Sequence, residues 1–379
     1  MSYFETEDVG IVVGRLCEYL IEATKHDEQL KTPDDSILRQ RYMNRFETLI
    51  SGLLQHIVGN FYIEPAKFKF EYEREILERE FLDLAIMQME QLPTHVSSYI
   101  VRLFGHIMLR YVYRNRCPLL DKMIIRGEHI LSRLCEYLLA GSSVSLDASK
   151  ILVYCIEHQA LARKVADLSV VGKPDSELIY LTIIRQVTEN CDFSILLAQF
   201  DFLKAFLLKH CSIQEYIFSR DHQVLDKHLT YLLCKCNTNY WLRMTVIEII
   251  SELAQNRYLL KCFVSPFTSK LSNIQIFFAM LKTWRQIDNT HSREEYLRLF
   301  EVFRLFILNP ESENKSELKL FLKNNLLTIK TFIEKARQIS SNIDICYTKY
   351  EYKSVMVKLY KLCGEELKIE KSRSSSLVL

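Results

Sequence analysis

The apolar residues of segment 239–258, NYWLRMTVIEIISELAQNRY, recur at the spacing of an α-helix. At about 3.6 residues per turn, residues three and four apart lie on one face. One such stripe is formed by Leu242, Val246, Ile249, Ile250 and Leu253. It predicts a helix over this segment with one face buried in a core.

A second apolar stripe lies about half a turn away on the same helix. It consists of Tyr240, Met244 and Ile247, with Arg243 beside them, where a surface helix normally places charged residues. Two interpretations stay open. Either Met244 and Ile247 pack on a neighbouring helix, or the stripe contacts a partner protein, since aromatic residues, methionine and arginine are enriched in protein interfaces.

One sequence pattern recurs along the chain. A helix with periodic apolar residues ends at a basic residue, a histidine or an asparagine, and a shorter helical stretch follows. The end residues are Arg110, His158, His210, Arg257 and Asn309, so the successive steps are 48, 52, 47 and 52 residues. Armadillo and HEAT units span about 40 to 47 residues in two or three helices, which fits slightly long units of this kind. We therefore predict an all-α protein, a right-handed α-solenoid of armadillo/HEAT-like repeats without β-sheet.

The unit that ends at Asn309 shows the expected two-faced pattern. Pro310 follows and cannot continue a helix. Glu294 and Arg298 form an exposed i, i+4 pair on the polar face. The inward face carries Tyr296, Phe300, Phe303 and Ile307.

The expected boundaries follow from the same pattern. A single helical-repeat domain covers 1–368, with repeats clearest over 93–340, and a low-complexity tail over 369–379 is expected to be disordered. A helix at about 345–363 is expected to cap the stack, because a terminal repeat needs a polar outer face. Its apolar face carries Tyr352, Val355, Met356, Leu359, Leu362 and Cys363, and its polar face carries Lys353, Lys358 and Lys361.

Composition narrows the function. Only 9 of the 379 residues are glycine, and glycine is what lets backbone approach a phosphate, so nucleotide-binding loops are disfavoured. The 49 Lys and Arg nearly balance the 47 Asp and Glu, which supplies no bulk attraction for nucleic acid or an anionic membrane. The first residues, MSYFETEDVG, are acidic where a secretory signal is basic and then apolar. We expect a cytoplasmic protein.

The eleven cysteines are scattered and lack the spacing of a disulfide framework, which favours buried, reduced thiols. Cys234 and Cys236 with His222 and His228 fit no zinc template. The chain also lacks a P-loop, a dinucleotide fingerprint, a zincin helix and a nucleophile elbow. We expect no catalysis, no cofactor, no metal and no small-molecule substrate.

A nucleic-acid-binding solenoid stays open as a rival. Arg110, Arg114 and Arg116 lie among tyrosines in RYVYRNRCPLL, and such mixtures can grip single strands. The acidic run EYEREILEREFLDL lies upstream, however, and an exposed helical face of mixed charge explains both stretches.

From about residue 140 to 335 the chain resembles the calcium-binding protein 39 family, also called mouse protein twenty-five. The resemblance rests on four segments in the family's order, SVSLDASKILVYCIEHQALARKV, NYWLRMTVIEIISELAQNRY, FEVFRLFILNP and FLKNN. It implies a non-catalytic helical-repeat scaffold that binds a protein kinase or pseudokinase of the STRAD or germinal-centre type on its concave face. A helical-repeat scaffold for a non-kinase client is the alternative.

The resemblance also implies two sets of site residues. The concave-face positions fall on Phe193, Tyr240, Arg243 and Met244. A pocket for a partner's C-terminal Trp-Glu-Phe peptide falls on Arg257, Leu260, Gln275, Phe278 and Lys323. The family pattern has basic residues at the positions of Met244 and Gln275 and a second lysine after Lys323, and the chain departs from it at all three.

Overall fold

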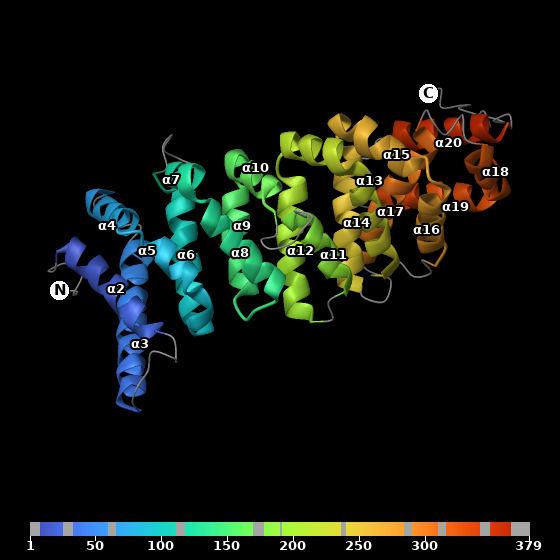
Figure 1. The fold of residues 1–379 in the computed structure, drawn as a ribbon. Helices are drawn as coiled ribbons and strands as arrows, with labels where there is room; N and C mark the ends of the chain where they lie inside the picture. Colours follow the sequence, from blue (N-terminus) through green and yellow to red (C-terminus); the bar gives the residue numbers. More distant parts are fainter. Residues whose placement is uncertain are drawn as a thin grey trace, which may run out of the picture. The chain divides into compact units, whose positions relative to one another are not determined.

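The computed structural model describes residues 8–25, 33–59, 66–110, 118–169, 178–189, 192–235, 240–283, 290–309, 316–341 and 349–364. These ranges consist of α-helices, short 3-10 and π-helical turns, and their connections (Figure 1). A single-residue antiparallel bridge joins Ser169 and Leu178, and no β-strand occurs within these ranges. The prediction of an all-α helical-repeat fold without a sheet is confirmed.

The chain divides into two compact units, unit 1 over 1–213 and unit 2 over 214–379. The division falls inside helix α13 (Cys211–Lys235). The elements of unit 1 are α2 (Val9–Ala23), α3 (Pro33–Leu54), η2 (Gln55–Gly59), α4 (Ala66–Glu78), α5 (Phe81–Met87), η3 (Met89–Gln91), α6 (Thr94–Arg110), α7 (Pro118–Arg126), α8 (Glu128–Ala140), α9 (Ser145–Ile156), α10 (Gln159–Asp167), α11 (Ile179–Glu189) and α12 (Phe193–Leu208). Unit 2 continues with α14 (Tyr240–Gln255), η6 (Arg257–Leu259), η7 (Leu260–Val264), α15 (Ser265–Thr268), α16 (Leu271–Thr283), α17 (Thr290–Leu308), α18 (Ser316–Asn324), α19 (Leu326–Ser341) and α20 (Lys349–Cys363).

The repeat anchors read from the sequence mark real helix ends. Helices α6, α9, α12, α14 and α17 each end at, or within two residues before, one of the five anchor residues. A shorter helical element follows α9 and α14, as expected, whereas α12 is followed by the longer helix α13. The interval between successive anchor residues therefore equals the length of the helices of one repeat together with the turns that connect them.

In unit 1, helix α9 packs against α6, α8 and α12, so the last helices of successive repeats are neighbours. Gly105 on α6 leaves room for this close approach. A Cβ atom at that position would lie 2.6 Å from ring carbons of Tyr154 on α9. Side-chain hydrogen bonds add to the contact: the Ser97 hydroxyl donates to the buried Asp147 carboxylate at 2.6 Å, and the Ser149 hydroxyl donates to the Ala198 carbonyl at 2.7 Å.

The turns after α9 and α12 are also joined to each other. Nε2 of His210 donates to the carbonyl of Ile156 at 2.7 Å, which satisfies one of the carbonyls left open at the end of α9. The Gln159 amide donates to the Ser212 hydroxyl at 2.7 Å, and Lys209 forms an ion pair with Glu157. Polar residues placed just after the helix ends thus connect one repeat turn to the next.

His158 lies in this junction and makes it sensitive to pH. Burial lowers the pKa of His158, the Glu157 carboxylate opposes this, and the neighbouring His210 lowers it further. Because the unfolded chain then binds more protons than the folded chain below about pH 6.5, stability should fall as the pH drops from about 7 toward 5. In denaturant titrations followed by circular dichroism at both pH values, we expect His158→Gln to reduce this loss. A pH dependence of stability that is the same in His158→Gln and in the parent chain would contradict the assignment.

In unit 2, helix α17 is the central element and packs against α14, α16, α19 and α20. Its predicted inward residues Tyr296, Phe300, Phe303 and Ile307 are all fully buried. On its polar face Arg298 Nη2 lies 3.0 Å from the Glu294 carboxylate, which confirms the predicted pair.

Helix α20 presents the predicted apolar face. Tyr352, Val355, Leu359, Leu362 and Cys363 are buried, and Met356 is half-buried. The Tyr352 ring stacks on Phe300 of α17 with centroids 5.9 Å apart, and its hydroxyl donates to the Ala336 carbonyl of α19 at 3.4 Å. The predicted tail, 369–379, lies outside the described residues.

Candidate functional site

Phe193, the concave-face candidate in unit 1, is the first residue of α12 and is 53% exposed. The Asp192 carboxylate caps this helix by accepting from the Ser194 amide at 2.8 Å and the Ser194 hydroxyl at 2.6 Å. These hydrogen bonds lower the pKa of Asp192, so the cap stays ionised at neutral pH. An aromatic ring is thus held at the start of a firmly capped helix, where a partner can reach it.

The other three concave-face candidates lie on α14 in unit 2. The first apolar stripe of this helix is buried as predicted. It consists of Leu242, Val246, Ile249, Ile250 and Leu253. On the opposite side of α14 the residues differ in burial. Ile247 is fully buried and belongs to the core, whereas Met244 stays half-buried. The Tyr240 side chain lies outside the described residues.

Arg243 has a partner inside the chain. Its Nη2 lies 3.2 Å from Oε1 of Glu295 on α17, and the Glu295 side chain is fully buried. A buried carboxylate requires a compensating cation, since an uncompensated charge in the interior is strongly destabilising. Arg243 therefore links α14 to α17, and any contact that it makes with a client must coexist with this pair.

The exposed part of α14 and α17 is charged. Arg298 on α17 lies between three carboxylates, with Nη1 3.6 Å from Glu248 and 3.9 Å from Glu252, and Nη2 3.0 Å from Glu294. Sequence periodicity identified the pair within α17. It missed the two partners on α14, because pairs between helices have no fixed spacing in the sequence.

The five candidate residues of the peptide pocket all belong to unit 2. Leu260 begins the π-helical turn η7 and is 53% exposed. Gln275 on α16 and Lys323 on α18 are also exposed, and the Arg257 side chain lies outside the described residues. The π-helical turn had no recognisable signal in the sequence, although such turns are frequent at functional sites.

Phe278 is the exception among the pocket candidates. It is 9% exposed, and its ring centroid lies 5.3 Å from Phe321, 5.4 Å from Phe332 and 6.4 Å from Phe303. These contacts join α16 to α17, α18 and α19, and they bring α16 next to the helix that carries Lys323. Replacing Phe278 by alanine would cost about 3–5 kcal/mol as a core truncation, so this residue cannot report peptide binding separately from stability.

Among the cysteines that the structure describes, the expected burial holds for Cys135, Cys155 and Cys363, whereas Cys17 and Cys262 are half-buried and Cys211 is exposed. Burial raises the pKa of the Cys155 thiol above its ordinary value and raises that of the Cys135 thiol to about 12. No group of three metal-ligating side chains occurs among the described residues. Cys236 lies outside them, as do the side chains of Cys234 and His222.

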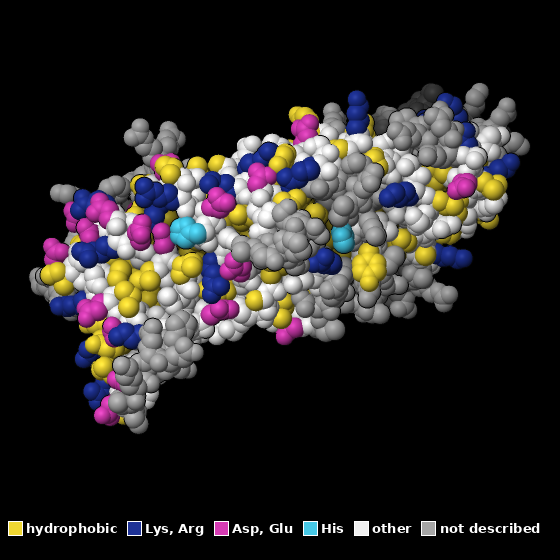
Figure 2. Space-filling model, in the orientation of Figure 1, with side chains coloured by type: hydrophobic (Ala, Val, Ile, Leu, Met, Phe, Trp, Pro, Cys, Tyr) yellow, Lys and Arg dark blue, Asp and Glu magenta, His cyan; other side chains and the backbone are white. Residues whose placement is uncertain are grey.

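The basic segment that motivated a nucleic-acid rival falls on residues 110–116. Residues 111–116 and the Arg110 side chain lie outside the described part. Over the face of unit 1 drawn in Figure 2, acidic and basic side chains are interspersed and do not gather by sign. A grip on single strands requires a continuous basic groove, and the described side chains of this face do not form one. None of the described helices combines the length and apolar character needed to cross a membrane.

Comparison with known protein families matches residues 15–344 to a family model described as Mo25-like. The match spans most of the chain, reaches well beyond the segment 140–335 that carries the motif resemblance, and includes every candidate residue above. A search of curated proteins returned no match.

Proposed function

The chain belongs to the Mo25-like family, and from this premise we propose that it is a non-catalytic scaffold that binds a protein kinase or pseudokinase of the STRAD or germinal-centre type in the cytoplasm. The family match is the observation that carries the proposal. It is supported by the exposure of Phe193 and the partial exposure of Met244 on the last helices of their repeats. Aromatic and methionine side chains are the types that anchor protein interfaces.

The proposal includes a second contact, in which a partner peptide ending in Trp-Glu-Phe binds near Arg257, Leu260, Gln275, Phe278 and Lys323. Exposed Leu260 offers apolar surface and Lys323 offers a cation for the peptide carboxylates. Phe278 contributes indirectly, because its ring contact with Phe321 holds α16 next to α18.

The peptide contact is tested by titrating a fluorescent peptide ending in Trp-Glu-Phe. We expect saturable binding by the parent chain and about tenfold weaker binding by Lys323→Glu, since reversing one charge opposite a carboxylate costs on the order of 1.4 kcal/mol. Lys353→Glu is the matched control, because Lys353 is an exposed lysine on α20 outside the proposed pocket. Absence of saturable binding by the parent chain, or equal affinities for both variants, would refute the pocket.

A scaffold for a non-kinase client is the second candidate, and one observation favours it. Arg243 is committed to Glu295, and Met244 and Gln275 carry no charge where the family has basic residues. A client that relies on those cations would bind this chain weakly. Affinity capture from native lysate separates the two candidates: enrichment of germinal-centre kinases or pseudokinases supports the first, and their absence among specifically bound proteins supports the second.

A further inference from the structure

A cavity of about 630 Å³ in unit 1 lies between the corner that joins α7 to α8 and the chain that leaves α10. Its volume falls within the range of about 300–1,000 Å³ that is usual for ligand pockets. It includes none of the candidate site residues above, and the inference that follows does not depend on the proposed function.

The corner between α7 and α8 forms one wall of the cavity. Gly127 fits this corner because a Cβ atom there would lie 2.6 Å from the carbonyl oxygen of Met123. Nδ1 of His129 donates to the carbonyl of Arg126 at 2.9 Å, which ties the first turn of α8 to the last residue of α7. The corner therefore holds Arg126 and Glu128, the residues on either side of Gly127, at set positions on the wall.

The charges on this wall are of opposite sign. Arg126 and Glu128 are both exposed, and neither forms an ion pair with any described residue. Asp167, the other carboxylate in the lining, already pairs with Nε of Arg163 at 3.3 Å. The cavity thus offers one cation and one anion to a ligand, and the ligand that complements them carries both an acidic and a basic group.

Apolar side chains line the space from two elements. Ile125, at the end of α7, is 74% exposed, whereas Leu168, just after α10, is largely buried. An aliphatic ligand side chain placed between them would shield Ile125 from water, which is favourable in proportion to the apolar area covered.

The chain that leaves α10 provides a backbone edge. Ser169 forms an antiparallel bridge with Leu178, and the amide of Ile179 donates to the carbonyl of Leu168 at 3.0 Å. In a pair flanked by such hydrogen bonds, the N–H and C=O of Ser169 point away from Leu178. Neither group has a hydrogen-bond partner among the described residues. Because Leu168 and Ser169 line the cavity and Leu178 does not, this unpaired edge lies on the cavity side.

From this arrangement we infer that the cavity binds an extended peptide segment in which an aliphatic residue lies between an acidic and a basic residue. The backbone of the aliphatic residue pairs with Ser169, as an added strand pairs with a sheet edge. Side chains two residues apart on an extended chain point to the same side, so the acidic and basic groups can reach Arg126 and Glu128 together. The aliphatic side chain occupies the space between Ile125 and Leu168.

The test follows the methyl resonances of Ile125 and Leu168 in the full chain, with isotope-labelled isoleucine and leucine methyl groups. The probe is acetyl-Ser-Glu-Val-Lys-Ser-amide. Its two comparison peptides are the neutral acetyl-Ser-Gln-Val-Gln-Ser-amide and the charged peptide with an N-methyl group on valine. We expect saturable shifts with the probe and about tenfold weaker binding of each comparison peptide.

Each comparison has an outcome that contradicts one contact. Equal affinity for the neutral peptide would overturn the charge pairing, and equal affinity for the N-methyl peptide would overturn the backbone pairing. Absence of a saturable shift at both methyl groups would overturn the site itself.

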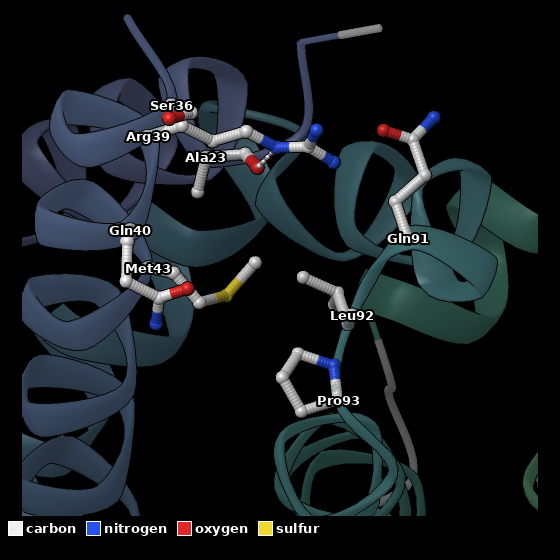
Figure 3. A pocket seen from close by; sticks show the side chains of 8 residues that line it. All are labelled: Ala23, Ser36, Arg39, Gln40, Met43, Gln91, Leu92 and Pro93. Atoms are coloured by element: carbon white, nitrogen blue, oxygen red, sulfur yellow. Dashed lines mark hydrogen bonds between the residues drawn. The ribbon is translucent and has the colours of Figure 1, made fainter. Parts of the chain in front are cut away.

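A second cavity in unit 1 supplies an internal reference. It measures about 410 Å³ and lies where the end of α2, the first half of α3 and the turn from η3 into α6 meet. Met43 and Leu92 point toward each other across it (Figure 3). None of its residues belongs to the proposed site, so the Leu92 methyl resonances should not shift. Shifts of Leu92 that saturate at the same peptide concentration as those of Leu168 would contradict the assignment.

Two peptides with a single charge assign the ionic contacts. Acetyl-Ser-Glu-Val-Gln-Ser-amide carries only the acid, and acetyl-Ser-Gln-Val-Lys-Ser-amide carries only the base. Arg126→Gln should weaken only the acidic peptide, to the level of the neutral one, and Glu128→Gln should weaken only the basic peptide. Arg45→Gln, at an exposed position of α3 that does not line the cavity, should change neither. If Arg126→Gln and Glu128→Gln weaken both peptides equally, or weaken neither, the ionic contacts are wrong.

Discussion

Replacing Arg243 by methionine should lower the free energy of unfolding of unit 2 by about 3–5 kcal/mol, because it leaves the fully buried Glu295 carboxylate without its cation. Both tryptophans of the chain, Trp241 and Trp284, lie in unit 2, so tryptophan fluorescence during urea titration reports on this unit. The urea midpoint should therefore shift markedly for Arg243→Met.

The double variant Arg243→Met with Glu295→Met should recover most of this loss. Replacing a buried ion pair by apolar side chains of similar size is often neutral or stabilising, whereas breaking the pair is not. Arg298→Met is the matched single control on the neighbouring face, where the carboxylates are partly exposed, and it should cost at most about 1 kcal/mol. If Arg243→Met lowers the free energy of unfolding no more than Arg298→Met does, the Arg243–Glu295 pair does not stabilise the contact between α14 and α17.

This pair bears directly on the proposed function. In the proposed function Arg243 contacts a client, whereas in the structure its guanidinium group lies against Glu295 of α17. A loss of client binding in an Arg243 variant would therefore mix a direct effect with a loss of stability. Among the proposed client contacts, Phe193 and Met244 are the better reporters, because neither takes part in a buried ion pair described above.

The periodic features of the fold could be predicted from the sequence because they depend on local spacing. The stripe from Leu242 to Leu253 is buried as expected, and the helices end beside residues such as His158 and Asn309, where the apolar period stops. Amphipathic spacing and helix-stop residues act within a few turns of one helix, so they are visible in a short window of sequence.

The candidate site was less predictable because its properties depend on distant residues. Ile247 is in the core and Met244 is half-buried, although both lie on the second stripe, since burial depends on the neighbouring repeat. The partner of Arg243 is 52 positions away, and three rings from three other helices surround Phe278. No local pattern specifies such pairs, so the choice between core and interface required the structure.

Removing the C-terminal helix should have the second large effect. Helix α20 covers α17, α18 and α19 with five buried side chains, and full burial of an aliphatic side chain contributes about 1.5–3 kcal/mol relative to exposure. A chain truncated after residue 344 should therefore expose the apolar faces of these helices, and a stack without its polar terminal face is expected to aggregate. Light scattering and size-exclusion chromatography of the purified truncated chain measure this outcome.

Two controls separate capping from a general effect of truncation. A chain that ends at residue 368 retains α20 and should behave as the parent does. In the full chain, Val355→Asp should reproduce part of the defect, because it places a carboxylate at a fully buried position, whereas Lys353→Asp, on the exposed face of the same helix, should not. A chain truncated after residue 344 that stays monomeric with an unchanged urea midpoint would show that α20 is dispensable for the stack.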